Sequence, residues 1–199
     1  MRLLTFILVV VLNYSCNEIN PNQQKYSKIK TGKTVSSKSV KQIQVSSLSI
    51  DLINKIFIES VDESHSFLEN KINDRVKKSY RRIEPFSLSK SHEIVRMIQD
   101  GNEVWIDLIM YSYENKKYKE ALQIIENDPM KGEIIFDKNW DRIIGIGSKL
   151  IRVNSGCTLS EQNWNRIINR FEVKIKESYK INWDGYKCKC GGPCKKGNL

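Results

Sequence analysis

The chain begins with a single cation, Arg2, which is followed by a mainly apolar run from position 3 to position 12. A cationic start, an apolar centre and a small residue before the cleavage point, here Ser15, are typical of a secretory signal peptide. The run is shorter than the roughly 20 apolar residues that a helix needs to span a bilayer. We therefore expect residues 1–15 to be removed and the remaining chain to fold outside the cytoplasm, where thiols tend to oxidise.

Ser15 and Cys16, with Leu12 four places before the cysteine, resemble the cleavage site of bacterial lipoproteins. Asn13 stands where this site usually carries an aliphatic residue. The resemblance implies that Cys16 becomes the new N-terminus and carries palmitate or a similar acyl group. The protein would then be bound to a lipid membrane of the bacterial cell envelope, on the periplasmic or the surface side. The alternatives are a cleaved signal without lipid, which gives a secreted protein, and an uncleaved anchor.

The net charge of +10 is unevenly distributed along the chain. Residues 17–47 contain six lysines and a single acid, Glu18, and four further lysines follow from position 187 onward. Arg2 and these two segments account for the whole net charge, so residues 48–186 are electrically neutral as a whole. A nucleic-acid-binding domain more usually carries its basic stripe on the folded surface. We therefore expect no nucleic-acid partner.

The composition divides the mature chain into three parts. Residues 16–47 are polar and rich in Ser, Lys, Asn and Gln, which predicts a flexible tether with a reach of roughly 30 Å after the lipidated cysteine. Residues 48–186 are numerous enough to form a single globular domain with its own core. Residues 187–199 form a basic, cysteine-rich tail.

Apolar residues recur every three or four positions in several segments, which is the helical period. The longest such segment, with Ser49 as its expected N-cap, predicts one helix over residues 50–83, or two collinear helices broken near residue 62. Its outer side would be a solvated cationic face. The same spacing predicts helices over residues 91–99, 137–154 and 160–175, although residues 149–153 could instead be a strand. Ser160 is the expected N-cap of the last of these helices. The cations of the solvated face are Lys71, Arg75, Lys78 and Arg82.

Residues 103–127 are ambiguous. The stretch from Val104 to Tyr111 is rich in residues that favour strands. Trp105, Leu108, Tyr118 and Ala121 have the spacing of one tetratricopeptide-type helical hairpin, and this resemblance favours helix. With a short strand or two around residues 133–136, we expect a mainly α fold: a small helical domain that holds at most one short β-hairpin. The alternative is an α+β fold.

Four cysteines remain besides Cys16. In an oxidising compartment they predict two disulfides, for which three pairings exist. The favoured scheme joins Cys157 to one of Cys188, Cys190 and Cys194 and joins the other two to each other. Linking residues about thirty positions apart stabilises a fold by roughly 3 kcal/mol in the loop-entropy model. The alternatives are a zinc or copper site built from Cys188, Cys190 and Cys194, and free thiols.

The sequence contains no serine elbow, glycine-rich phosphate loop or zinc-binding helix motif. Its two histidines, His65 and His92, are adjacent to acids and are expected on the surface. We predict no cofactor and no catalytic residues. The expected function is a non-catalytic binding or interaction module at the cell envelope, with an unidentified protein partner. The alternatives are a metal-handling lipoprotein that uses the C-terminal cysteines and an envelope hydrolase without a recognisable motif.

Overall fold

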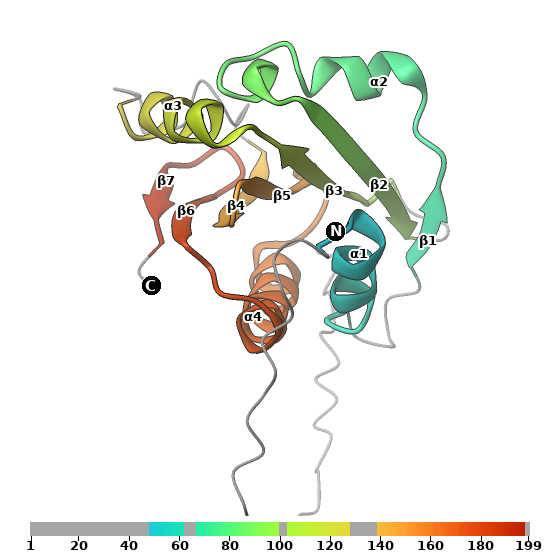
Figure 1. Ribbon diagram of the computed structural model, residues 1–199. Coiled ribbons are helices and arrows are strands. Elements are labelled where there is room, and N and C mark those ends of the chain that lie inside the picture. Colours follow the sequence, from blue (N-terminus) through green and yellow to red (C-terminus); the bar gives the residue numbers. More distant parts are fainter. Residues whose placement is uncertain (1–47, 62–66, 100–102, 128–138, 198–199) are drawn as a thin grey trace, which may run out of the picture. The chain divides into compact units, whose positions relative to one another are not determined.

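The computed structural model describes residues 48–61, 67–99, 103–127 and 139–197, which all belong to one compact unit, Val40–Leu199. Within these residues, seven strands form one sheet in the order β1-β2-β3-β5-β4-β6-β7, and all neighbouring strands are antiparallel (Figure 1). The strands are β1 (Phe67–Asn70), β2 (Ser91–Gln99), β3 (Trp105–Ser112), β4 (Trp140–Ile146), β5 (Lys149–Ser155), β6 (Trp183–Cys188) and β7 (Cys194–Lys196).

The expectation of a mainly helical domain is therefore wrong. Residues 91–99 are β2, and residues 140–155 form the hairpin of β4 and β5 instead of one helix. For the hairpin of β4 and β5 the physical reason is burial on both faces, since every residue of β4 is buried. A strand buried on both faces has a continuous apolar run in place of an alternating one, and such a run also satisfies a helical period. Strand β2 is only partly buried, and its pairing with β1 and β3 fixes its conformation.

The predicted helix over residues 50–83 is also wrong in its length. Helix α1 covers only Ile50–Ile58, with Ser49 as the expected N-cap, and α2 covers Asp74–Ser79. Strand β1 lies between them in sequence. Residues 103–127, which the sequence left open, form β3 followed by helix α3 (Asn115–Glu126). The strands expected around residues 133–136 and the site of His65 lie outside the described residues.

The turn between β4 and β5 interrupts the helix predicted over residues 137–154. Ile146 pairs with Lys149, so the hairpin loop has two residues, Gly147 and Ser148. Gly147 has a φ of 61°, in the left-handed region that glycine adopts without steric cost. A glycine at the first loop position is typical of a two-residue hairpin turn.

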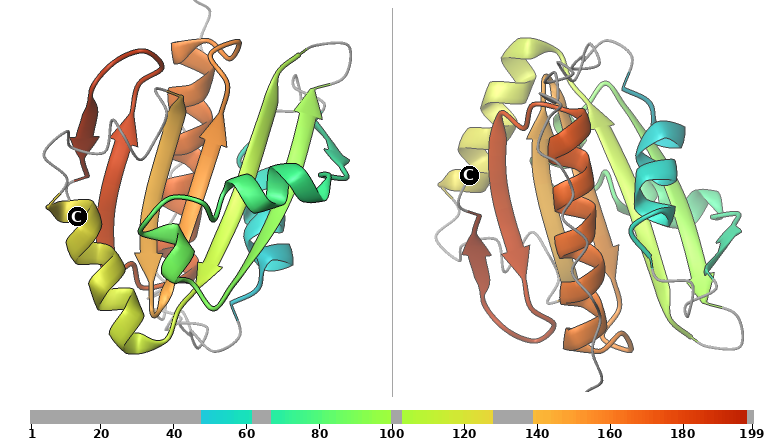
Figure 2. Two further views of the ribbon diagram at one scale, coloured as in Figure 1. Left: turned by 90° about the horizontal axis from the view of Figure 1, so that it is seen from above. Right: turned by 90° about the horizontal axis from the view of Figure 1, so that it is seen from below.

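Helices α1 and α4 (Glu161–Ser178) cover one face of the sheet, as Figure 2 shows from below. The predicted last helix is thus confirmed, including Ser160 as its N-cap. Its buried stripe packs on the sheet, where the ring centroids of Trp164 and Trp140 lie 6.0 Å apart. Phe171 also contacts Phe57 of α1, with centroids 5.6 Å apart. This face holds the larger of the two hydrophobic cores.

The opposite face is covered by α2, the 3₁₀ helix η2 (Phe86–Leu88) and α3, as Figure 2 shows from above. Phe86 stacks on Tyr111 of β3 with ring centroids 4.6 Å apart. Tyr118 and Ala121 of α3 belong to the same second core. Both faces of the sheet are therefore buried.

Two disulfides bond all four C-terminal cysteines. Cys157 is joined to Cys190, and Cys188 is joined to Cys194, its partner across β6 and β7. The predicted disulfide bonding is confirmed. Residues 187–196 end β6 and form β7, so the sheet includes most of the basic tail. Across the described ranges, no helix combines the length and the apolar character that crossing a bilayer requires.

Candidate binding cavity

Polar residues form a row across four central strands at one level of the sheet. Arg96 of β2 pairs with Asp107 of β3, Asp107 pairs with Asn154 of β5, and Asn154 pairs with Asp141 of β4. The residues that flank them along each strand, such as Leu108 and Val153, belong to the core under α1 and α4. Because successive side chains of a strand point to opposite faces, the polar row lies on the face of α2 and α3.

Two arginine–aspartate pairs dominate this polar row. The Nε and Nη2 atoms of Arg96 donate to the two carboxylate oxygens of Asp107 at 2.6 and 2.7 Å. Arg152, two residues before Asn154 on β5, donates in the same bidentate manner to Asp141, with both distances 2.7 Å. Asn154 Nδ2 donates to Asp141 Oδ2 at 2.7 Å, and the Tyr80 hydroxyl donates to Asp107. Each carboxylate therefore accepts from an arginine and from a neutral donor.

Three of these four ions are almost completely removed from solvent, whereas the side chain of Arg96 is 22% exposed. The exposed fraction is 0% for Asp107, 1% for Asp141 and 5% for Arg152. Transferring an ion from water to the interior costs several kcal/mol, which only close and well-oriented partners can offset. The bidentate geometry supplies such partners.

The same surroundings determine the protonation of Arg152 and Tyr80. Burial by itself lowers the pKa of Arg152, but the charge of Asp141 and its hydrogen bonds outweigh burial and leave that pKa above its ordinary value. Burial raises the pKa of Tyr80, and the neighbouring Asp107 carboxylate raises it further. Near neutral pH Arg152 is therefore charged and Tyr80 is neutral.

A cavity of about 160 Å³ lies against this row. Strands β3 and β5 contribute Trp105, Arg152 and Asn154, and the segment from the end of α2 to η2 contributes the opposite wall. The Arg152 guanidinium lies 5.2 Å from the ring centroid of Phe86 and 5.7 Å from that of Tyr80. The remaining lining residues are Ser79, Ile83 and Asn139.

The size and lining of this cavity limit its contents. At a share of about 30 Å³ for each water in the liquid, the cavity has room for about five waters. An apolar cavity of about 150 Å³ accommodates one benzene ring, so a single six-membered ring also fits. Convergent polar side chains beside aromatic walls are typical of small-molecule sites.

A second, smaller hollow of about 70 Å³ lies near the disulfides, lined by Trp140, Trp164 and Cys188 with the lysines of β6 and β7. At about 30 Å³ for each water, this hollow has room for about two waters. Its lining is largely apolar, and the polar row does not reach it. The larger cavity is therefore the candidate binding site.

The residues singled out from the sequence lie elsewhere. Cys16 and His65 are outside the described residues. His92 is half-buried on β2, where it stacks on Tyr111 at 6.2 Å and its Nε2 lies 3.0 Å from the carbonyl oxygen of Lys77. The tail cysteines are held in disulfides and so are not thiolates, and no cluster of three or more candidate metal ligands occurs among the residues described.

Sequence reasoning missed the cavity, although one signal was present. Asp107 and Arg152 each interrupt an apolar segment. A charge inside such a run is buried if the run is buried, and a buried charge requires a partner. The signal marks the residues as candidates, but it does not indicate which of them meet.

By its fold, the protein is a disulfide-linked α+β domain in which helices cover both faces of an antiparallel sheet. No protein-family model, curated protein or solved structure matches the chain.

Proposed function

We propose that this protein is an exported, non-catalytic binding module of the bacterial cell envelope, anchored through an acylated Cys16, and that it binds a small molecule in the cavity beside Arg152. The observation that carries the proposal is the cavity itself, because two buried polar side chains of the central strand β5, Arg152 and Asn154, line it. Side chains fixed by strands and by bidentate pairs are held in place before any ligand arrives. Such preorganisation lowers the entropic cost of binding.

The ionisable side chains that line the cavity favour binding over catalysis. Tyr80 and Arg152 both have a raised pKa. A general base must lose its proton near the working pH to be effective, and neither group does so near neutrality. This argument supports a binding module over the alternative of an envelope hydrolase.

Two features support export and anchoring. Two disulfides are typical of proteins from oxidising compartments. The signal-like residues 1–15 and the cysteine that follows them supply the route and the attachment point.

The anchor is tested by the intact mass of the protein extracted from envelopes. We expect a chain that begins at Cys16, carries acyl groups, and resists alkylation until its disulfides are reduced. Cys16→Ser should release the protein from the membrane fraction. The mass of an unmodified chain that begins at another residue would contradict the proposed lipid anchor. It would leave the proposed binding cavity untouched.

The cavity is tested by native mass spectrometry and by thermal shift against a panel of small polar molecules, with the full chain. Ser79→Phe places a large ring at the cavity wall. It should abolish binding both of a ligand that co-purifies with the protein and of a ligand that is added. Ser87→Phe is the matched control, because Ser87 is exposed on the same segment and does not line the cavity. Equal ligand binding by both variants would refute the assignment of the site.

A further inference from the structure

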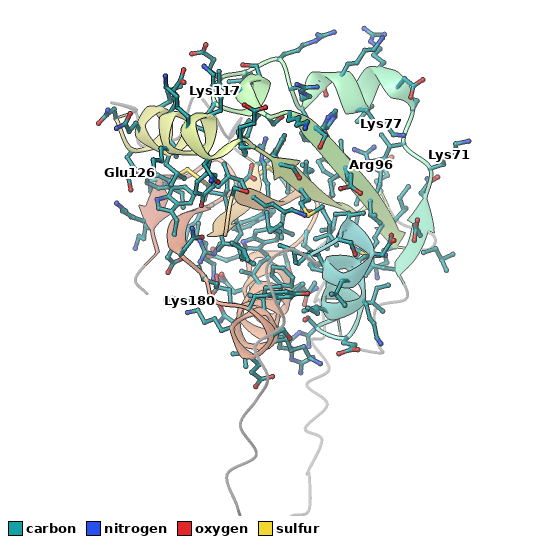
Figure 3. The ribbon with its side chains drawn as sticks, viewed as in Figure 1. Lys71, Lys77, Arg96, Lys117, Glu126 and Lys180 are labelled. Carbon is teal, nitrogen blue, oxygen red and sulfur yellow. A yellow bond between two sulfur atoms is a disulfide. The ribbon has the colours of Figure 1, made fainter. Side chains whose placement is uncertain are left out.

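The wall of the cavity that α2 and η2 form belongs to a strongly cationic segment, residues 71–90. This segment contains two acids, Asp74 and Glu84. Figure 3 shows Lys71 and Lys77 on the side of the sheet that carries α2, whereas Lys180 lies on the side of α4. The cations of the segment are Lys71, Arg75, Lys77, Lys78, Arg81, Arg82 and Lys90.

The charges of this segment are not neutralised locally. Among the residues that the structure describes, Lys71, Arg75, Lys78, Arg82 and Lys90 are all exposed and form no ion pair. The buried row below, in contrast, contains equal numbers of arginines and aspartates. The electrostatic potential near the cavity is therefore positive because of segment 71–90, which covers the cavity. This potential attracts anions from solution.

The hydrogen-bonding groups of the cavity differ between its two walls. On the sheet side, the guanidinium of Arg152 can only donate, and its Nε and Nη2 already donate to Asp141. The amide of Asn154, whose Nδ2 also donates to Asp141, lines the same wall. On the cover side, the Ser79 hydroxyl donates to the carbonyl oxygen of Val76 at 2.6 Å, and the Tyr80 hydroxyl donates to Asp107. A hydroxyl has one hydrogen, so Ser79 and Tyr80 can only accept from a ligand.

We propose that the cavity binds a ring-shaped hydroxy acid, a single six-membered ring that carries one acidic group and at least one hydroxyl. This inference rests on the proposed function and names its ligand class. The acid faces Arg152, the hydroxyl donates to Ser79 or Tyr80, and the ring lies between the aromatic walls. Sugar acids and hydroxylated aromatic acids share this chemistry.

Calorimetric titration of the full chain with matched compounds tests the ligand class. The probes are glucuronate and para-hydroxybenzoate, which distinguish the two sources. Glucose and phenol lack the acid, and benzoate lacks the hydroxyl. Because hydrogen bonds to charged groups are the stronger ones, we expect loss of the acid to weaken binding roughly tenfold or more, and loss of the hydroxyl to weaken it less.

Substitutions at the cavity separate charge from shape. Asn139→Asp adds a negative charge to the lining and should weaken binding of the acids roughly tenfold, without a comparable effect on glucose or phenol. Asn127→Asp, on the exposed end of α3, is the matched control. Arg152→Lys changes the proposed contact to the acid directly, but it also disturbs the buried pair with Asp141. If Arg152→Lys fails to fold, Asn139→Asp still tests the proposal.

The cationic cover is tested by association rates. The double variant Lys71→Gln/Lys78→Gln should slow association of the acid at about 0.02 M salt and have little effect at about 0.2 M, because salt screens exposed charges. Lys180→Gln, on the other side of the sheet, should leave the rate unchanged.

The outcomes separate the two proposals. Tight binding of glucose or phenol, equal to that of the acids, would overturn the ligand class while the cavity remained a binding site. Binding of no compound in the panel would overturn the ligand class as well. If Ser79→Phe and Ser87→Phe then also behaved alike toward every other ligand, the proposed function would fail with it.

Discussion

The carboxylate of Asp141 on β4 and the guanidinium of Arg152 on β5 form a bidentate ion pair in the interior of the sheet, with both N–O distances at 2.7 Å. The side chains are 1% and 6% exposed. Each ion is thus stable in the interior only while the other is present, and the pair also fixes the guanidinium that lines the cavity.

Removing one partner of this pair should strongly destabilise the fold. We expect Asp141→Ala to lower the free energy of unfolding by roughly 3–5 kcal/mol, because it leaves Arg152 buried without its carboxylate. Urea denaturation measures the change. Lys117→Ala is the control, since Lys117 and Glu120 form an exposed pair for which about 0–1 kcal/mol is expected. Equal losses in the two variants would contradict the account.

The two disulfides should differ in their effect on stability. Cys157 and Cys190 are 33 residues apart in sequence, whereas Cys188 and Cys194 are 6 apart. In the loop-entropy model the longer loop contributes roughly 3–4 kcal/mol and the shorter roughly 2 kcal/mol. We therefore expect Cys157→Ser/Cys190→Ser to lower the denaturation midpoint more than Cys188→Ser/Cys194→Ser does. The opposite order would show that the buried packing of Cys188 outweighs loop entropy.

The hairpin turn between β4 and β5 should require glycine at one position. Gly147→Ala forces a side chain into a backbone conformation with a φ of 61°, which costs about 1–2 kcal/mol. Ser148→Ala at the next position should change stability by less than about 0.5 kcal/mol. Thermal unfolding followed by circular dichroism compares the two variants, and a neutral Gly147→Ala would refute this assignment of the turn.

Stability should fall in alkaline solution because of buried tyrosines. Burial raises the pKa of Tyr118 to about 12, against an opposing hydrogen bond with Asn182. Between pH 10 and 12 the unfolded chain therefore binds fewer protons than the folded chain at this residue, and stability decreases as pH rises. The expected loss from Tyr118 is about 1 kcal/mol per pH unit.

Tyr118→Phe isolates this contribution. The variant should lose less stability than the unmodified protein between pH 10 and 11, as measured by urea denaturation at each pH. If stability fell equally steeply with pH in the two proteins, the prediction would be wrong. Tyr118 would then not differ in its protonation between the folded and the unfolded chain in this range.

Local signals in the sequence predicted some elements correctly. Ser160 accepts a hydrogen bond from the backbone N–H of Asn163, as an N-cap should, and the apolar positions of α4 face the core. Ser49 caps α1 in the same way. The disulfides followed from the number and spacing of the cysteines. Each of these features depends on residues close in sequence or on composition.

The sheet could not be predicted in this way. Trp140, Ile143, Ile144 and Leu150 satisfy a helical period, but they are apolar because helices cover both faces of their strands. Strand β3 pairs with β5, and β4 pairs with β6, across long stretches of chain. No local pattern specifies which strands are neighbours.

The sequence by itself therefore determined the caps of two helices and the presence of paired cysteines, since these depend on short-range chemistry or on composition. Only the tertiary structure decided that residues 140–155 are strands, that Asp141 faces Arg152 and that a cavity lies above them. Those features arise from contacts between segments distant in sequence, and long-range burial outweighs local propensity there. The candidate site belongs to this second group, because strand order brings its residues together.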